Sequence, residues 1–326
     1  MKLARRTFLH LAATGSIAVP AALRIASAQS YPTRPVHVIV GFAVGGPNDI
    51  SARLIGQWLS ERFGQPFVIE NRPGAASNLA TEMVVRAAPD GYTLLLVGTP
   101  GAINATLYDN LNFNFIRDIA PVAGILLAPI VMIVNPSVPV HTVPEFIAYA
   151  KANPGKINLA SPGSGTTPHV AGELFKLMTD IKLVTVSYRG GGPALVDVLS
   201  GQVQAMFESS LSSLALIKQG RLRALAVTSA TRLSSLPDVP TIAEFVPDFE
   251  ATSWFGIGAP KKTPPEIIEV LNKEINSGLA DPTIRERLAD LSGVPMPMSA
   301  AEFGKLIVEE TDKWAKVIRA ANIKPD

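Results

Sequence analysis

The stretch that decides the fold is Val38-Ile39-Val40-Gly41-Phe42-Ala43-Val44-Gly45-Gly46-Pro47-Asn48-Asp49-Ile50. Its first three residues predict a buried β-strand, and its glycines predict a tight turn. After the turn, apolar residues recur at helical spacing and predict a helix up to Phe63: Ile50, Leu54, Ile55, Trp58 and Leu59. Gly64 and Pro66 supply the signals that end this helix. The sequence therefore predicts a strand, a glycine turn and a helix in direct succession.

The start of this predicted helix is a candidate anion site. The backbone N–H groups of a first helical turn have no partner within the helix, and the macrodipole adds about half a positive charge there. A carboxylate or a phosphate is therefore favoured beside Gly45 and Gly46.

Residues 1–28 have the composition of an export peptide. Lys2, Arg5 and Arg6 form a basic start, a mostly apolar segment follows, and residues 26–28 form a small-residue cleavage signal. Residues 4–9 resemble the twin-arginine export motif, and the choice between that route and general secretion stays open. We expect an exported mature chain that begins at Gln29.

Export changes the charge balance of the chain. The whole sequence has a net charge of +2, but its export peptide carries four basic and no acidic residues, so the mature chain has a net charge of −2. A weakly acidic chain without a basic run argues against nucleic acid as a partner. The absence of cysteine excludes disulfides, thiol nucleophiles and cysteine-bound zinc. Residues 122–134 are apolar but too few to span a membrane, so we expect a soluble mature protein.

Strands and helices alternate after Phe63. Residues 67–70 and 92–97 predict strands, and residues 79–87 predict a short helix between them. These strands are continuous apolar runs, which are typical of parallel sheets covered by helices on both faces. The sequence therefore predicts an α/β fold.

A second unit begins where residues 123–134 predict a crossing strand. Within this unit a strand, a small-residue loop and a helix repeat, with loops at 161–168, 188–193 and 208–210. Open α/β sheets bind ligands at such loops, because these lie at the carboxyl ends of the strands. Residues 253–258 predict a strand that returns to the first unit, where three terminal helices pack.

These transitions predict the domain organisation. We expect a signal peptide at residues 1–28, a first domain formed by residues 29–126 and 251–326, and a second domain at residues 127–250. Domains joined by crossing strands suit hinge closure around a ligand.

Few side chains are candidates for chemistry. The mature chain has His37, His141 and His169, none of them at metal-ligand spacing, and it has no nucleophile elbow or phosphate-binding lysine loop. His169 follows a glycine-rich loop, where it contacts a ligand or caps a helix. Asp49 pairs with Arg53 four residues later or recognises a polar group of the ligand. We expect no catalytic residue, no metal and no cofactor.

Ordered motifs extend over almost the whole mature chain: Tyr31-Pro32-Thr33-Arg34-Pro35, Gly45-Gly46 with Asp49 and Arg53, Glu70-Asn71-Arg72-Pro73-Gly74-Ala75, Ala88-Pro89-Asp90-Gly91-Tyr92-Thr93-Leu94, Ala150-Lys151-Ala152-Asn153-Pro154-Gly155-Lys156, Tyr188-Arg189-Gly190, Leu222-Arg223-Ala224-Leu225-Ala226-Val227-Thr228 and Leu236-Pro237-Asp238-Val239-Pro240-Thr241. Together these motifs resemble the Bug family, the extracytoplasmic solute receptors of tripartite tricarboxylate transporters.

The resemblance implies a periplasmic two-domain α/β receptor of the Venus-flytrap type, with a ligand cleft between its domains. It implies that the chain captures a small carboxylate and delivers it to the membrane permease subunits of the transporter. Backbone amides and hydroxyls hold the ligand in that family, and we expect a monomer. The resemblance assigns ligand contacts to Phe42, Gly45, Gly46, Asp49, Thr99, Asn104, Ser161, Gly165, Thr166, His169, Tyr188, Gly191, Gly192 and Glu208.

Three positions depart from the family pattern. Gly41 and Ser187 stand where the family has proline, which predicts looser loops, and Glu208 stands where aspartate is commoner. The identity of the carboxylate therefore stays open among amino acids, dicarboxylates, tricarboxylates and aromatic acids. Two other functions also stay open: an exported hydrolase that uses Asp49, His169 or Glu208, and a sensor that reports to a signalling partner.

Overall fold

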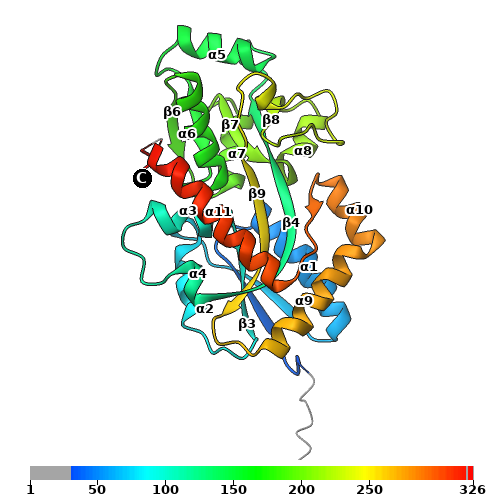
Figure 1. Ribbon diagram of the computed structural model, residues 1–326. Helices are drawn as coiled ribbons and strands as arrows, with labels where there is room; N and C mark the ends of the chain where they lie inside the picture. The colour runs from blue at the N-terminus through cyan, green and yellow to red at the C-terminus, as the bar shows by residue number, and fades with distance from the viewer. Residues whose placement is uncertain (1–30, 321, 326) are drawn as a thin grey trace, which may run out of the picture.

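The computed structural model describes residues 31–320 and 322–325, which form two lobes (Figure 1). The predicted export peptide, residues 1–28, lies outside the described residues. The first lobe consists of β1 (Val36–Val40), α1 (Pro47–Phe63), β2 (Phe67–Asn71), η1 (Ala75–Ser77), α2 (Asn78–Val85), β3 (Thr93–Gly98), α3 (Thr99–Leu107), α4 (Phe115–Asp118), α9 (Pro265–Ala280), α10 (Pro282–Asp290), β10 (Val294–Pro295) and α11 (Ala300–Ala320). The second lobe consists of α5 (Val143–Ala152), β5 (Asn158–Ser161), α6 (Thr167–Thr179), β6 (Val184–Ser187), α7 (Gly191–Leu199), β7 (Ala205–Ser209), α8 (Ser210–Lys218), β8 (Arg223–Val227) and η2 (Ile242–Glu244).

Two long strands connect the lobes, β4 (Ile119–Val134) and β9 (Thr252–Pro260). The strand order is β2-β1-β3-β9-β4-β7-β5-β6, and β8 and β10 also pair with β4. β4 pairs with β9 along its first part and with β7 and β8 along its last residues, so it belongs to the sheets of both lobes. Figure 1 shows β4 and β9 running side by side through the middle of the molecule.

The sheet of the first lobe is mixed. β1 pairs in parallel with β2 and β3, as the continuous apolar strands predict. β9, however, lies between β3 and β4 and is antiparallel to both. The expectation of parallel sheets alone is therefore wrong here, because the chain leaves the first lobe along β4 and returns in the opposite direction along β9.

Helices cover both faces of this sheet, as the continuous apolar strands predict. Ile39 of β1 and Leu95 of β3 pack into a core shared with α2, α3 and α11. Their neighbours Val38 and Leu94 face the opposite side, where α1, α9 and α10 complete a second core. Successive strand residues point to opposite faces, and both faces are buried here, so each strand is apolar throughout.

The sheet of the second lobe directs its loops toward the first lobe. β5 is parallel to β6 and β7, and each of these strands is followed by a short loop or directly by a helix: α6, α7 and α8. Because the strands are parallel, the starts of these three helices lie at one edge of the sheet. Contacts between α3 and α6 and between α1 and α8 join this edge to the first lobe.

Local signals predict most helix boundaries. Thr142 caps α5, since its hydroxyl accepts a hydrogen bond from the Glu145 N–H at 3.3 Å, while the Glu145 carboxylate accepts from the His141 N–H at 2.6 Å. The three terminal helices are present as α9, α10 and α11. The sequence motifs did not predict α3, which begins at Thr99 directly after β3. α3 supplies two of the residues that the family resemblance assigns to the ligand.

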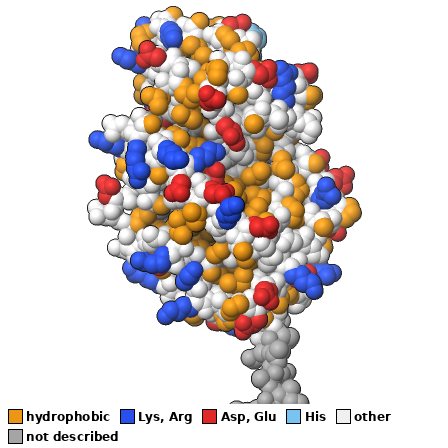
Figure 2. All heavy atoms as spheres, in the orientation of Figure 1, with side chains coloured by type: hydrophobic (Ala, Val, Ile, Leu, Met, Phe, Trp, Pro, Cys, Tyr) orange, Lys and Arg blue, Asp and Glu red, His pale blue; other side chains and the backbone are white. Residues whose placement is uncertain are grey.

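The surface carries charges of both signs. Figure 2 shows acidic and basic side chains interspersed over one face, with apolar patches between them. This mixture differs from the contiguous basic stripe that a nucleic-acid backbone attracts. Among the described residues, no helix combines the length and the apolar character needed to cross a membrane.

Candidate functional site

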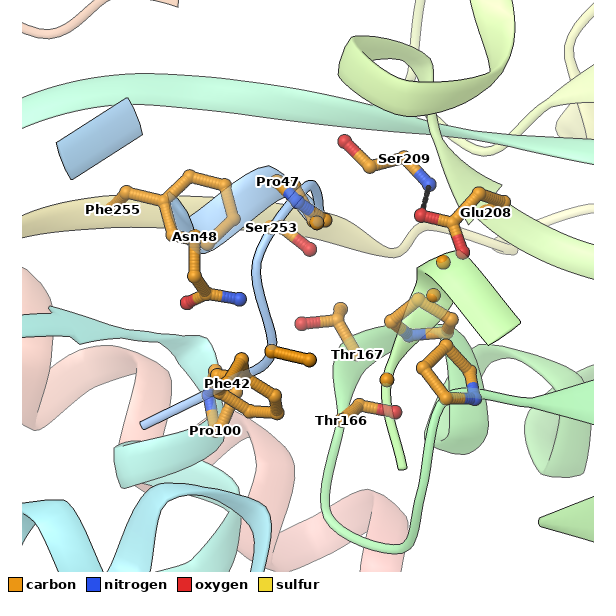
Figure 3. Close-up of a pocket in the computed structure, with 17 residues that line it drawn as sticks. Phe42, Pro47, Asn48, Pro100, Thr166, Thr167, Glu208, Ser209, Ser253 and Phe255 are labelled. Carbon is orange, nitrogen blue, oxygen red and sulfur yellow. Dashed lines mark hydrogen bonds between the residues drawn. The ribbon is translucent and has the colours of Figure 1, made fainter. Parts of the chain in front are cut away.

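A pocket between the two lobes lies where several helices begin. We call it the cleft pocket, and its lining residues are Phe42, Ala43, Gly46, Pro47, Asn48, Pro100, Pro162, Thr166, Thr167, Pro168, Gly190, Gly191, Gly192, Glu208, Ser209, Ser253 and Phe255 (Figure 3). They include the starts of α1, α3, α6, α7 and α8. Its cavity volume is about 40 Å³, which corresponds to roughly three water molecules or a single carboxylate group.

The start of α1 contributes backbone amides from the first lobe. The turn before it requires Gly45, whose φ of +81° lies in the left-handed region that favours glycine. Gly46 is the N-cap residue, and its position provides no side-chain hydrogen bond to the first turn. Figure 3 shows the side chain of Asn48 directed into the pocket from this turn. The N-terminus of α1 is therefore open to an anion.

Asp49 stabilises this turn and does not line the cleft pocket. Its carboxylate accepts hydrogen bonds from the Gly45 N–H and the Arg53 guanidinium, each at 3.0 Å, and from the Asn71 amide at 3.0 Å. Burial opposes ionisation of Asp49, but these hydrogen bonds and the charge of Arg53 outweigh it and lower the pKa of Asp49. The predicted pairing of Asp49 with Arg53 is confirmed.

The start of α7 contributes the corresponding amides from the second lobe. Gly190 is its N-cap residue, with a φ of +124° and no side-chain cap. Gly191 follows, and a Cβ atom at this position would lie only 2.7 Å from the Glu208 Oε2 atom. The absence of a side chain at Gly191 therefore lets the first turn of α7 lie against the Glu208 carboxyl group.

Glu208 is the one ionisable side chain among the residues that line the cleft pocket. It is at the end of β7 and only 1% exposed. Its Oε1 atom accepts hydrogen bonds from the Ser209 N–H at 3.0 Å and the Ser212 hydroxyl at 2.7 Å, while Oε2 is buried without a hydrogen-bond partner. Burial raises the pKa of Glu208 to about 7, although the Ser212 and Ser209 donors act against this rise.

The start of α6 brings hydroxyl groups to the same space. The Thr166 hydroxyl caps α6 by accepting a hydrogen bond from the His169 N–H at 3.3 Å. Figure 3 shows the hydroxyl groups of Thr167 and Ser253 directed toward the pocket from α6 and β9. His169 is 5% exposed and is not a lining residue; its Nδ1 atom lies 3.4 Å from the Gly165 N–H, which donates to it.

Thr99 and Asn104 of α3 connect structural elements instead of lining the cavity. The Thr99 hydroxyl accepts a hydrogen bond from the Trp254 N–H at 2.9 Å and so ties α3 to β9. The Asn104 amide donates to the Ala76 carbonyl at 2.8 Å and lies directly against Gly165 of the second lobe. Asn104 therefore forms part of the contact between the lobes.

A second cavity shares Phe42 and Pro162 with the cleft pocket as lining residues. Its volume is about 470 Å³, and Arg189 is the one basic residue that lines it. Tyr188 also lines it, and its hydroxyl donates a hydrogen bond to Asp197 at 2.7 Å. Burial and this hydrogen bond raise the pKa of Tyr188 to about 12, so its hydroxyl stays protonated.

The structure brings together about half of the site residues that the family resemblance assigns. Phe42, Gly46, Thr166, Gly191, Gly192 and Glu208 line the cleft pocket, and Tyr188 lines the second cavity. The remaining residues line neither cavity: Gly45, Asp49, Thr99, Asn104, Ser161, Gly165 and His169. Ser161 holds the loop after β5, because its hydroxyl accepts from the Gly163 N–H at 3.3 Å.

Several lining residues were missed from the sequence. Asn48 and Thr167 stand beside predicted residues at helix starts, so their neighbours could have indicated them. Ser253 and Phe255 carry no such signal, because β9 reaches the pocket only through its place in the sheet. Among the described residues, no group of histidine, aspartate or glutamate side chains is arranged to hold a metal ion.

Comparisons with known proteins agree with this geometry. Residues 51–323 match the model of the tripartite tricarboxylate transporter family receptor. The chain is 37% identical to protein BugT of Bordetella pertussis over 315 residues, which cover 96% of this chain and 95% of BugT.

Solved structures share the fold. An R. palustris protein solved with adipate superposes with a TM-score of 0.88 at 36% identity, covering 91% of this chain and all of that one. MatC from Rhodopseudomonas palustris with bound malate superposes with a TM-score of 0.84 at 31% identity, covering 88% of this chain and all of MatC. With its two α/β lobes and the pocket between them, the chain belongs to the family of tripartite tricarboxylate transporter receptors.

Proposed function

We propose that this chain is a periplasmic receptor that binds a small carboxylate in the cleft pocket and delivers it to the membrane permease of a tripartite transporter. One observation carries the proposal. The starts of α1 and α7 come from opposite lobes, lack side-chain caps, and meet at a pocket whose lining residues include no lysine or arginine. Backbone amides and helix dipoles would therefore hold the anion.

The related structures support the ligand class. One relative was solved with adipate and another with malate, both of which are dicarboxylates. The cleft pocket has room for one carboxylate group, and the second cavity with Arg189 lies beyond Phe42. A dicarboxylate would place one carboxylate at the helix starts and extend past Phe42 toward Arg189.

The proposal includes the organisation of the protein. Export by a cleaved peptide at residues 1–28 would bring residues 29–326 to the periplasm as a monomer. The first domain would comprise residues 29–126 and 251–326, and the second would comprise residues 127–250. Closure of the two domains would then present the bound carboxylate to the permease.

Thermal unfolding of the refolded mature protein tests the ligand class. Malate, succinate, adipate, citrate, aspartate and benzoate are each added, with glucose as the neutral control. A ligand at a hundred times its dissociation constant stabilises the native state by about 2.7 kcal/mol, which gives a clear rise in Tm. A panel in which glucose raises the Tm and no carboxylate does so would overturn the proposal.

A variant pair tests the position of the anion. Asn48→Asp adds a negative charge at the pocket, and the favourable effect of an acidic residue in the first helical turn offsets part of the cost of burying that charge. We expect an affinity loss of at least about tenfold, since two like charges at about 4 Å repel by several kcal/mol near a protein surface. Asn110→Asp makes the same charge change at an exposed position and should bind normally. Equal affinities of the two variants would place the anion elsewhere.

Hydrolysis has less support than binding. Asp49 and His169 do not line the cleft pocket, so the three groups that a hydrolase could use do not converge there. Mass spectrometry of the ligand after prolonged incubation distinguishes the two functions, because a receptor returns the carboxylate unchanged. Copurified proteins distinguish a permease partner from a signalling partner.

A further inference from the structure

One buried oxygen atom in the cleft pocket has no partner within the protein. It is Oε2 of Glu208, in a side chain that is 1% exposed. The other oxygen, Oε1, already accepts hydrogen bonds from Ser209 and Ser212. Figure 3 shows the second oxygen directed into the pocket, away from Ser209. An ionised carboxylate in this position would leave a charged oxygen unpaired at the place where the proposed function puts an anion.

We propose that Glu208 binds the ligand as a neutral carboxylic acid, with Oε2 donating its proton in a hydrogen bond to an oxygen of the ligand carboxylate. The inference rests on the proposed function and narrows its ligand class to carboxylates without an ammonium group near this contact. The proton comes from solvent, no covalent bond of the ligand is made or broken, and the complex holds one proton on Glu208 for each ligand molecule bound.

Two features of the site favour the neutral form. Burial raises the pKa of Glu208 to about 7, so the Glu208 carboxyl group is already protonated in a large share of the free receptor at neutral pH. A bound anion would raise this pKa further, because like charges disfavour ionisation of the carboxyl group. A ligand ammonium would have the opposite effect, since it would favour the ionised carboxylate. The pH dependence of binding therefore has a different sign for the two ligand types.

Other titratable groups on the surrounding elements could also cause pH dependence. β4 and β5 contribute none, and the groups on the neighbouring helices and on the loop before α7 are His169, Glu173, Lys176, Tyr188, Arg189, Asp197 and Lys218. Of these, Glu173 pairs with Lys176 at 2.6 Å, and Asp197 accepts the hydrogen bond of Tyr188. Across the cleft, Asp49 is held by Arg53. His169 is the group among these whose ordinary pKa lies nearest to neutrality, so the test must separate it from Glu208.

The Glu208→Gln variant distinguishes the titration of Glu208 from that of His169, because glutamine has the shape of the protonated acid and cannot titrate. Its oxygen can accept from Ser209 and Ser212, and its amide can donate where Oε2 lies, so the fold and the ligand contact are both kept. Glu173→Gln serves as the matched control, since it makes the same chemical change on α6 at a residue that lines neither cavity.

The experiment is isothermal titration calorimetry with malate, succinate and adipate between pH 6 and pH 9, where these ligands are largely ionised, and with aspartate as the ligand that carries an ammonium group. Wild type and Glu173→Gln should lose affinity as pH rises above about 7, approaching tenfold per pH unit, with uptake of close to one proton at high pH. Glu208→Gln should bind with the affinity of wild type at pH 6 and lose little of it by pH 9.

Four results overturn the inference. A wild-type affinity that is constant from pH 6 to pH 9 overturns it. A pH dependence that persists in Glu208→Gln also overturns it, because another group such as His169 then titrates. Affinity that rises with pH, seen only with aspartate or another amino acid, would instead show an ionised Glu208 that pairs with an ammonium. Failure of every carboxylate to bind at any pH overturns the proposed function and this inference with it, so the two failures are distinguishable.

Discussion

Replacing Gly165 with alanine should disturb the contact between the two lobes. Gly165 has a φ of +81°, and a Cβ atom there would lie 2.0 Å from the Asn104 Oδ1 atom and 3.3 Å from the Ala76 Cβ atom. Gly155 provides a matched control, because it has a similar φ of +70° and a Cβ atom there would have no neighbour within 4 Å. Both variants incur the cost of a left-handed alanine, and only Gly165→Ala adds the collision.

The expected loss of stability depends on the backbone conformation at Gly165 and on how far Asn104 must move. A left-handed alanine costs about 1–2 kcal/mol in either variant. In Gly165→Ala the Asn104 amide must also move by about an ångström to reach an ordinary contact distance, which breaks its hydrogen bonds to Ala76 and Asn78. Each buried polar group left without a partner costs about 1–3 kcal/mol. We therefore expect Gly165→Ala to be about 2–5 kcal/mol less stable than Gly155→Ala if the lobes stay together.

The lobes can also respond by separating, in which case stability changes less and ligand affinity falls. Urea unfolding and calorimetric binding of a carboxylate therefore have to be measured on both variants and on wild type. Gly165→Ala should fall below Gly155→Ala in stability, in affinity or in both. If the two variants match in both measurements, Asn104 and Gly165 do not form the tight contact described above.

Two further predictions concern the turns that hold the site. Thr99→Val should lower the free energy of unfolding by about 1–3 kcal/mol, because the buried Trp254 N–H loses its acceptor. Thr99→Ser keeps the hydroxyl and should stay near wild type in urea unfolding. Equal losses of stability in the two variants would contradict this prediction. The folded-state pKa of Asp49 lies below its ordinary value of 3.8, so Asp49 contributes stability above about pH 4 that is lost as pH falls through the lower folded pKa. In acid titrations of stability, Asp49→Asn should be less stable than wild type at neutral pH and converge with it on acidification, and parallel curves would speak against the pairing with Arg53.

The parts of the fold that follow from local signals were predictable from the sequence. The strand, turn and helix around Gly45 depend on neighbouring residues, and β1 and α1 are present where expected. The pairing of Asp49 with Arg53 was predictable for the same reason, because four residues make one helical turn. The repeated order of strand, loop and helix in the second lobe gave the direction in which its helix starts point.

Long-range pairing was not predictable in this way. The direction of β9 depends on a partner strand more than a hundred residues away in the chain, and neither composition nor periodicity records it. α3 was missed because Gly98, Pro100 and Gly101 are turn residues in isolation, although a proline in the first turn also starts helices.

The residues of the candidate site also divide into those that local sequence signals predict and those that depend on long-range pairing. Gly191 follows β6 and Glu208 lies at the end of β7, and both strand ends are visible in the sequence, so the position of these two residues at the cleft was predictable. Ser253 reaches the pocket from β9 and required the sheet order. The unpartnered Oε2 of Glu208 could not be predicted from the sequence either, because it depends on how closely Gly191 and Ser212 approach the Glu208 carboxyl group.

The place of β9 in the sheet has a consequence for the order in which the protein folds. The second lobe has all its strands once β8 has been synthesised, whereas β9 must insert between β3 and β4 to complete the first. β3 therefore keeps an open edge during synthesis, and closing it requires contacts between distant segments, which form slowly. The lobe whose strands are made first is therefore the last to be completed, which gives chaperones a period in which to act on an incomplete sheet.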